Sequence, residues 1–131
     1  MGVLILIETL RLKIWGRDFS LPLVYDTLSD GVVAEKQMQA FENFKKHLEW
    51  IDASKAKVEE YCEADVLDDD NNQKKDNIFS YIKPESIYVD RKKEYPQVAI
   101  MCKYKYDPEH GLAVVFEAGG KVIVGIQDII L

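Results

Sequence analysis

The sequence has few of the residues from which active sites and metal sites are usually built. Its 131 residues include only two cysteines and two histidines. The cysteines, Cys62 and Cys102, are not in C-x-x-C spacing, and neither His47 nor His110 has a convincing second zinc ligand nearby. We therefore expect no cofactor and no typical zinc site. Two unpaired thiols favour a reducing compartment, with a single disulfide as the alternative.

The signatures of nucleotide binding and of common hydrolases are missing as well. There is no G-x-x-x-x-G-K-[ST] or G-x-G-x-x-G loop to cradle a phosphate. There is also no G-x-S-x-G nucleophile turn and no H-E-x-x-H metal motif. Gly119 and Gly120 are typical of a hairpin turn instead. The sequence therefore favours a protein that is not an enzyme.

Long apolar runs and excess positive charge are absent too. No run approaches the roughly 20 residues of a membrane helix, and the apolar N-terminus lacks the basic start and cleavage site of a signal peptide. The net charge is −6, whereas nucleic-acid binding needs clustered Lys and Arg. We expect a cytoplasmic protein that binds neither membrane nor nucleic acid. The acidity serves solubility, or it provides a surface for a basic protein partner.

The chain length predicts one domain, 1–131. The first part of this domain is predicted to be a β-hairpin. Apolar and polar residues alternate over 10–25, on both sides of Gly16-Arg17, and Val3 to Ile7 can extend the first strand. Pro22 removes one ladder donor, which predicts an edge strand. A type II′ loop at Gly16-Arg17 would pair apolar residues on one face: Ile14 with Phe19, Leu12 with Leu21 and Leu10 with Leu23.

After the hairpin the apolar period changes to that of an amphipathic helix, with Ser29 or Asp30 as its predicted N-cap. A second helix is expected near Ser54, because Asp52 or Ser54 can cap a new start; one continuous helix is the alternative. The predicted inward stripe of the first helix is Met38, Phe41, Phe44, Leu48 and Ile51. The predicted inward residues of the second helix are Val58, Tyr61 and Cys62.

Two shorter segments follow the helices. The polar stretch 65–77 predicts a solvated loop, since it lacks the alternation and the closing glutamate of a calcium loop. Residues 78–82 predict a short helix or turn ended by Pro84. Residues 86–90 predict a short strand, with Ile87 and Val89 on one face.

The densest apolar region, 97–131, predicts an antiparallel β-meander. Three apolar runs are separated by the turn signals D-P-E-H-G and G-G. Both faces of these strands are apolar, so the helices would cover one face and the N-terminal hairpin the other, unless the sheet is strongly curled. A two-residue turn at Gly119-Gly120 would pair Phe116 with Ile123 and Val115 with Val124. The predicted fold class is α+β: an N-terminal β-hairpin, a helical pair and a C-terminal antiparallel meander packed on the helices.

The motif D-P-E-H-G, Asp107 to Gly111, is the strongest local signal for a site. The favoured interpretation is a tight turn, because Asp107 can bond the backbone, Pro108 presets the turn and Gly111 allows positive φ. A carboxylate metal site at Asp107, Glu109 and Asp128 is one alternative. A hydrolase triad of Cys102, His110 and Asp128 is another, and it requires an accessible cysteine with a lowered pKa.

Tyrosines also suggest a surface for a protein partner, because Tyr is favoured at interfaces. Tyr88, Tyr95, Tyr104 and Tyr106 would form an exposed aromatic face. The hypothetical binding residues, which would act through the surface that the turn presents, are Tyr106, Asp107, Glu109, His110, Gln127 and Asp128. The expected protein is a monomer, or a homodimer formed through an edge strand.

Four segments resemble a bacterial family known only as a domain of unknown function: Q-x-x-A-F at 37–41, I-K-P-E-S-I-Y-V at 82–89, Y-D-P-E-H-G-L-A-V-V-F at 106–116 and V-G-I-Q-D-I-I at 124–130. D-P-E-H-G-L and G-x-Q-D are the specific pieces. Tyr106 stands where Trp is expected in many relatives. The resemblance implies an α+β fold and a bacterial origin, and it transfers no catalytic residues. Some similar families occur beside polymorphic-toxin and immunity loci, which implies an immunity-like binding module.

Overall fold

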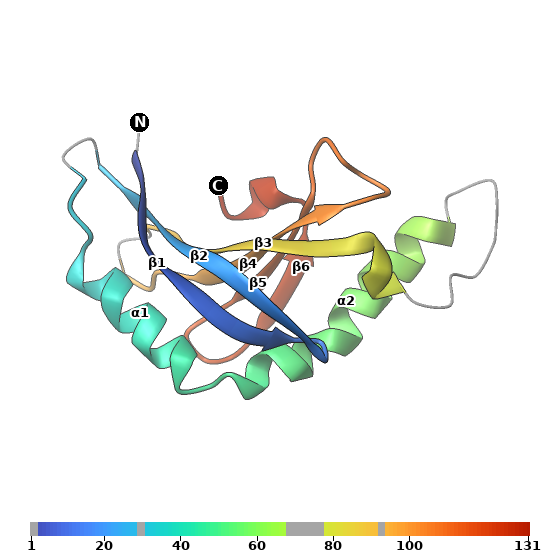
Figure 1. Cartoon of the computed structure of the whole chain (residues 1–131), viewed down its shortest axis with the longest axis horizontal. Coiled ribbons are helices and arrows are strands. Elements are labelled where there is room, and N and C mark those ends of the chain that lie inside the picture. Colours follow the sequence, from blue (N-terminus) through green and yellow to red (C-terminus); the bar gives the residue numbers. More distant parts are fainter. Residues whose placement is uncertain (1–2, 29–30, 68–77, 92–93) are drawn as a thin grey trace.

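The computed structural model describes residues 3–28, 31–67, 78–91 and 94–131, and within these ranges it is an α+β fold with one six-stranded sheet (Figure 1). The strands are β1 (Val3–Ile14), β2 (Arg17–Thr27), β3 (Ile82–Val89), β4 (Val98–Tyr104), β5 (Leu112–Phe116) and β6 (Val122–Gly125). The helices are α1 (Glu35–Lys45) and α2 (Glu49–Leu67), with 3₁₀ turns η1 (Ile78–Tyr81) and η2 (Gln127–Ile129). The predicted hairpin, helical pair and meander are confirmed.

The strands lie in chain order, and neighbouring strands are antiparallel except β2 and β3. These two are parallel because the two helices lie between them in the chain and return it to the same end of the sheet. Figure 1 shows both helices on one side of the sheet. No helix in the described ranges is long and apolar enough to cross a membrane.

The main core fills the space between the sheet and the helices. Ile100, Val114 and Phe116 of the sheet belong to the same buried cluster as Phe44 and Val58 of the helices. A second, smaller cluster lies on the other face: Tyr88, Ala99, Met101, Ala113, Val115 and Ile130. The N-terminal hairpin does not cover that face as expected, because β1 and β2 continue the same sheet. Ile130, just after η2, packs there instead.

The first hairpin has a different register from the predicted one. Ile14 pairs with Arg17, Leu12 with Phe19 and Leu10 with Leu21. The loop is therefore Trp15-Gly16, with φ of 50° and 85°, as a type I′ turn requires at both central positions. The shift is two residues, so the predicted core face is preserved.

Trp15 has a positive φ, which is unfavourable for a residue with a β-carbon, and burial of its side chain offsets this cost. Its Nε1 donates to Ser54 Oγ at 3.1 Å, and its ring lies 5.0 Å from that of Phe79.

The prediction of an edge strand from Pro22 is wrong, since β2 lies between β1 and β3. Pro22 is tolerated because β2 pairs with β3 only over Leu23 to Tyr25.

The helix boundaries also differ from the prediction. The chain leaves α1 at Lys45 and enters α2 at Glu49, so the break precedes the predicted one at Asp52 to Ser54. Ser54 is buried, donates to the Ile51 carbonyl and accepts from Trp15, and so it cannot cap a new helix. The N-cap of α1 is Ala34, and Ser29 and Asp30 lie outside the described residues.

The apolar stripe predicted to face the core from the first helix is only partly buried. Phe41, Phe44 and Ile51 are buried, whereas Met38 and Leu48 are 46% and 40% exposed. Of the residues predicted inward on α2, Val58 and Cys62 are buried and Tyr61 is half-buried. Residues 65–67, predicted as loop, end α2, and 68–77 lie outside the described residues. Strand β3 begins at Ile82 and passes through Pro84, with a bulge before Ser86.

The β5–β6 turn is one residue longer than predicted. Glu117 N donates to Lys121 O and Gly120 N donates to Glu117 O, both at 2.9 Å, and Gly120 has φ of 91°. This is a three-residue loop with glycine in the left-handed position. Phe116 therefore pairs with Val122. A shift of one residue in the pairing turns every side chain of β6 to the other face of the sheet. Val122 and Val124 therefore pack on the core, while Ile123 is exposed.

Candidate binding site

The turn Asp107 to Gly111 is stabilised by its own first residue. The Asp107 carbonyl accepts from Gly111 N at 2.8 Å, and Asp107 Oδ1 accepts from His110 N at 3.2 Å. Gly111 has φ of 64°, the conformation that favours glycine. The interpretation of this motif as a tight turn is therefore confirmed.

His110 is attached to the turn rather than to a catalytic partner. Its Nδ1 lies 3.0 Å from Asp107 Oδ1. The hydrogen bond to Asp107, together with the negative charges of Asp107, Glu109 and Asp128, raises the pKa of His110 above its ordinary value. Glu109, His110 and Asp128 are exposed, so this end of the molecule presents two exposed carboxylates and one histidine.

The other three predicted binding residues are engaged inside the fold. Gln127 Nε2 donates to the Cys102 carbonyl at 3.0 Å, and Gln127 N donates to His110 O at 3.1 Å. These bonds fasten the C-terminal segment to the turn. The ring of Tyr106 lies 5.2 Å from that of Tyr81. Asp107 is half-buried and holds the turn.

The geometry does not favour Cys102 as a nucleophile. Cys102 is fully buried in the main core, and its Sγ donates to the Ile100 carbonyl at 3.8 Å. Burial raises the pKa of the thiol, followed by the charge of Glu85, which is the reverse of what a reactive cysteine needs. Cys62 is buried as well. Within the described ranges, no three Asp, Glu, His or Cys side chains are grouped so that they could hold a metal ion.

A concave site lies beyond the other end of β4. It is a hollow of about 500 Å³, and its lining residues are Glu94, Tyr95, Gln97, Glu117, Ala118 and Gly119. These residues precede β4 and follow β5, whereas the Asp107 turn follows β4. The two candidate surfaces are therefore at opposite ends of the sheet. Tyr95 is 71% exposed, which is unusual for a large aromatic side chain.

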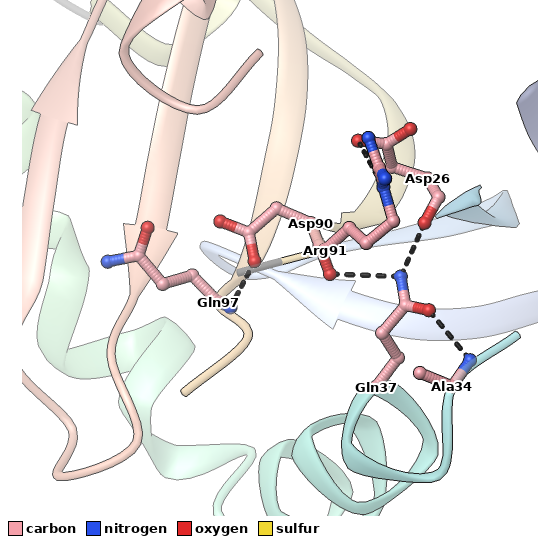
Figure 2. A network of polar contacts seen from close by, with 6 residues as sticks. All are labelled: Asp26, Ala34, Gln37, Asp90, Arg91 and Gln97. Carbon is pink, nitrogen blue, oxygen red and sulfur yellow. Dashed lines mark hydrogen bonds and ion pairs between the residues drawn. The ribbon is translucent and has the colours of Figure 1, made fainter. Parts of the chain in front are cut away.

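The first wall of the hollow, 94–97, is held by a buried carboxylate. Asp90 is 3% exposed. Its Oδ1 accepts from Gln97 N at 2.7 Å (Figure 2), and its N donates to Gln97 O at 3.0 Å. These two bonds close the connection between β3 and β4, so Tyr95 is displayed from a short loop with fixed ends.

Gln37 fixes Asp90 in turn, as Figure 2 shows. Gln37 is 1% exposed. Its Nε2 donates to the Asp26 carbonyl at 2.6 Å and to the Asp90 carbonyl at 3.0 Å, and its Oε1 accepts from Ala34 N at 2.9 Å. One amide thus joins the ends of β2 and β3 to the start of α1. Arg91 Nε lies 3.9 Å from Asp26 Oδ2 at the edge of this network.

The second wall, the β5–β6 turn, rests on the helices. Asn43 Nδ2 donates to the Ala118 carbonyl at 3.2 Å. A β-carbon on Gly120 would lie 2.9 Å from the Trp50 ring, so glycine permits the turn to sit directly on Trp50. His47 stacks on Trp50 with ring centres 4.5 Å apart. Both walls are therefore held by contacts from distant parts of the chain.

The predicted aromatic face does not form. Tyr88 and Tyr104 are buried on opposite faces of the sheet, and Tyr106 is half-buried, so only Tyr95 of the four is exposed. Burial raises the pKa of Tyr88, and the charge of Asp26 and its hydrogen bond to Tyr88 add to the increase. Sequence patterns missed Glu94, Gln97 and Glu117, because no motif joins two segments about 20 residues apart.

Comparison with protein-family models finds one family that matches most of the chain. A model described as a domain of unknown function (DUF6985) matches residues 6–131, and so it covers the sheet from Leu6 of β1 onward, both helices and the hollow. No curated protein and no solved structure matches the chain. The expectation of an uncharacterised domain family is confirmed: the chain belongs to the DUF6985 family.

Proposed function

We propose that this chain is a non-enzymatic bacterial binding module that acts in the cytoplasm and binds a protein partner through the hollow. The observation that supports this proposal is the exposed Tyr95 at the wall of a concave site. Tyrosine is among the residues that most often dominate binding energy when a partner covers them. The walls are fixed before binding, which lowers the ordering cost of association.

The charges favour a partner with a basic surface. The hollow has two carboxylates in its lining, Glu94 and Glu117, and the chain carries a net charge of −6. Arg91 is directed to Asp26, while Lys92 and Lys93 lie outside the described residues. A basic partner would be steered by the overall charge and then meet the acidic lining.

An immunity-like role is the specific form of this proposal. Some families similar to the one that this sequence resembles occur beside polymorphic-toxin and immunity loci, and an immunity protein acts by binding its toxin rather than by catalysis. The gene next to that of this chain should then encode a toxin. An adjacent gene of unrelated function, together with a partner encoded elsewhere, would contradict the immunity-like role and leave the binding module intact.

Site-specific photo-cross-linking tests the proposal in the cells that make the protein. A photoreactive amino acid at position 95 of the full chain should capture one protein, because position 95 would lie in the interface. The same amino acid at position 131 is the control, since Leu131 is similarly exposed, at 68%, but follows η2 at the other end of the sheet. Failure to capture a protein from position 95 would overturn the proposal.

Variants then measure the contribution of the hollow to binding of the captured partner. Tyr95→Ala should weaken binding by about 10- to 100-fold, as loss of a hot-spot aromatic does. Glu94→Gln should weaken it less, with a smaller loss at high salt. Glu109→Gln removes a carboxylate that is also exposed, from the Asp107 turn, and should leave binding unchanged. The opposite ranking of Tyr95→Ala and Glu109→Gln would assign binding to the turn.

A further inference from the structure

Each wall of the hollow carries a carboxylate that no cation of the described part of the chain neutralises. Glu94 lines the hollow from the connection between β3 and β4, and Glu117 lines it from the β5–β6 turn. Other surface carboxylates, such as Glu42 and Glu85, have a lysine Nζ at 2.9 Å and 3.5 Å. Among the described residues, no ion pair or hydrogen bond involves the carboxylate of Glu94 or Glu117.

A partner that covers the hollow takes both carboxylates out of water. A carboxylate that loses water without gaining a cationic partner is strongly unfavourable. Glu117 is half-buried before any partner arrives. An apolar or acidic side chain in the hollow would therefore weaken the complex, whereas a cation would offset the lost hydration. The partner has to supply this cation, because no described lysine or arginine of this chain lines the hollow.

The other lining side chains favour arginine over lysine as the cation. A guanidinium is planar, bonds carboxylates through a fork of donors, stacks on aromatic rings and is less strongly hydrated than an ammonium. Tyr95, which is 71% exposed, supplies a ring. Gln97 also lines the hollow, and Figure 2 shows its side chain directed away from Asp90. Its amide oxygen adds an acceptor for the five N–H donors of a guanidinium.

We propose that the hollow receives one arginine side chain of the partner, with the guanidinium between Glu94 and Glu117 and stacked on Tyr95. This inference rests on the proposed function, because it names the chemistry of the partner that the hollow binds. A volume of about 500 Å³ is within the range of sites that enclose a ligand. The backbone of both walls is held in place by Asp90 and Asn43 before binding.

N-acetyl-arginine amide is the probe that tests the hollow in the absence of the partner. In NMR spectra of the full chain, it should shift the backbone amide signals within 94–97 and 117–120, with millimolar affinity. N-acetyl-lysine amide should need a concentration about tenfold higher, because an ammonium lacks the planar fork. N-acetyl-citrulline amide has nearly the same shape without the charge and should cause no shift.

Variants of the chain show whether these shifts depend on the two carboxylates. Glu94→Gln combined with Glu117→Gln should abolish the arginine-dependent shifts, whereas the control Glu109→Gln should keep them. Both carboxylates are at the surface and make no described bond, so the fold should not change. Shifts that persist in the double variant, or that the lysine probe causes equally well, overturn the proposal. Absence of shifts at about 100 mM arginine probe, far above millimolar affinity, also overturns it.

The captured partner provides the second measurement. The partner arginine nearest the cross-link to position 95 is replaced by lysine, and binding should weaken by about tenfold or more. The loss should be smaller against Glu94→Gln/Glu117→Gln, because the paired groups are already separated. A captured partner with no arginine near the cross-link, or one that tolerates the replacement, overturns the arginine inference and leaves the proposed function intact. Absence of any captured protein overturns the proposed function itself, so the two failures are distinguishable.

Discussion

Replacing Gln37 with leucine is expected to lower the free energy of unfolding by about 3 kcal/mol. The side chain keeps a similar size, so little cavity forms. The loss comes from the Asp90 carbonyl, which Gln37 bonds in a buried environment, and from the Asp26 carbonyl and Ala34 N, which it bonds in a partly buried one. Each buried polar group that loses its partner costs on the order of 1–3 kcal/mol. Urea unfolding measures the change.

The same helix supplies the control for this prediction. Gln39→Leu makes the same chemical change two residues away, where the side chain is exposed and bonds Glu35 at 3.5 Å. It should change stability by less than about 0.5 kcal/mol. Equal effects of the two substitutions would show that the Gln37 network does not stabilise the fold. Gln37→Leu should also weaken partner binding, because the network holds the loop that displays Tyr95.

Gly111→Ala is expected to cost about 3 kcal/mol of stability. Part of this is the left-handed backbone at Gly111, which costs a residue with a β-carbon about 1–2 kcal/mol. The rest is crowding, since the β-carbon would lie 2.7 Å from Gln127 Nε2 and 2.8 Å from the Cys102 carbonyl oxygen. The bond between these two groups must then break, which removes one of the two bonds that fasten the C-terminal segment to the turn.

Gly16→Ala separates the two contributions. Gly16 has φ of 85°, and a β-carbon there would meet nothing within 4 Å. It should therefore show the backbone cost alone, about 1–2 kcal/mol, in the same urea unfolding measurement. A loss at Gly111 no larger than that at Gly16 would mean that the close approach of Gln127 to the turn contributes nothing to stability.

Local patterns predicted the elements well and the registers poorly. Alternating apolar residues located both hairpins, because one buried face imposes a period of two. The exact loops depended on contacts distant in sequence: Trp15 turns with positive φ because Ser54 and Phe79 receive its side chain. Gly120 makes a three-residue turn that sits on Trp50. No signal near either turn specifies these partners.

In the candidate sites, too, local patterns predict only the features that depend on neighbouring residues. The Asp107 turn was predictable, because Asp, Pro and Gly act locally in a turn. The hollow was not, because its walls come from separate segments and are fixed by Gln37, Asp90 and Asn43. In the sequence Gln37 belongs only to the family-like segment 37–41, and its buried amide, which joins two strand ends to a helix, has no sequence signature.

Hydrogen exchange of the chain with and without its captured partner tests the central claim most directly. Binding through the hollow predicts slower amide exchange in 94–97 and 117–120, the segments that form its two walls. Exchange in 106–111 should not change, because that turn lies at the other end of the sheet. Protection of 106–111 with no change in 94–97 would contradict the account and assign recognition to the Asp107 turn.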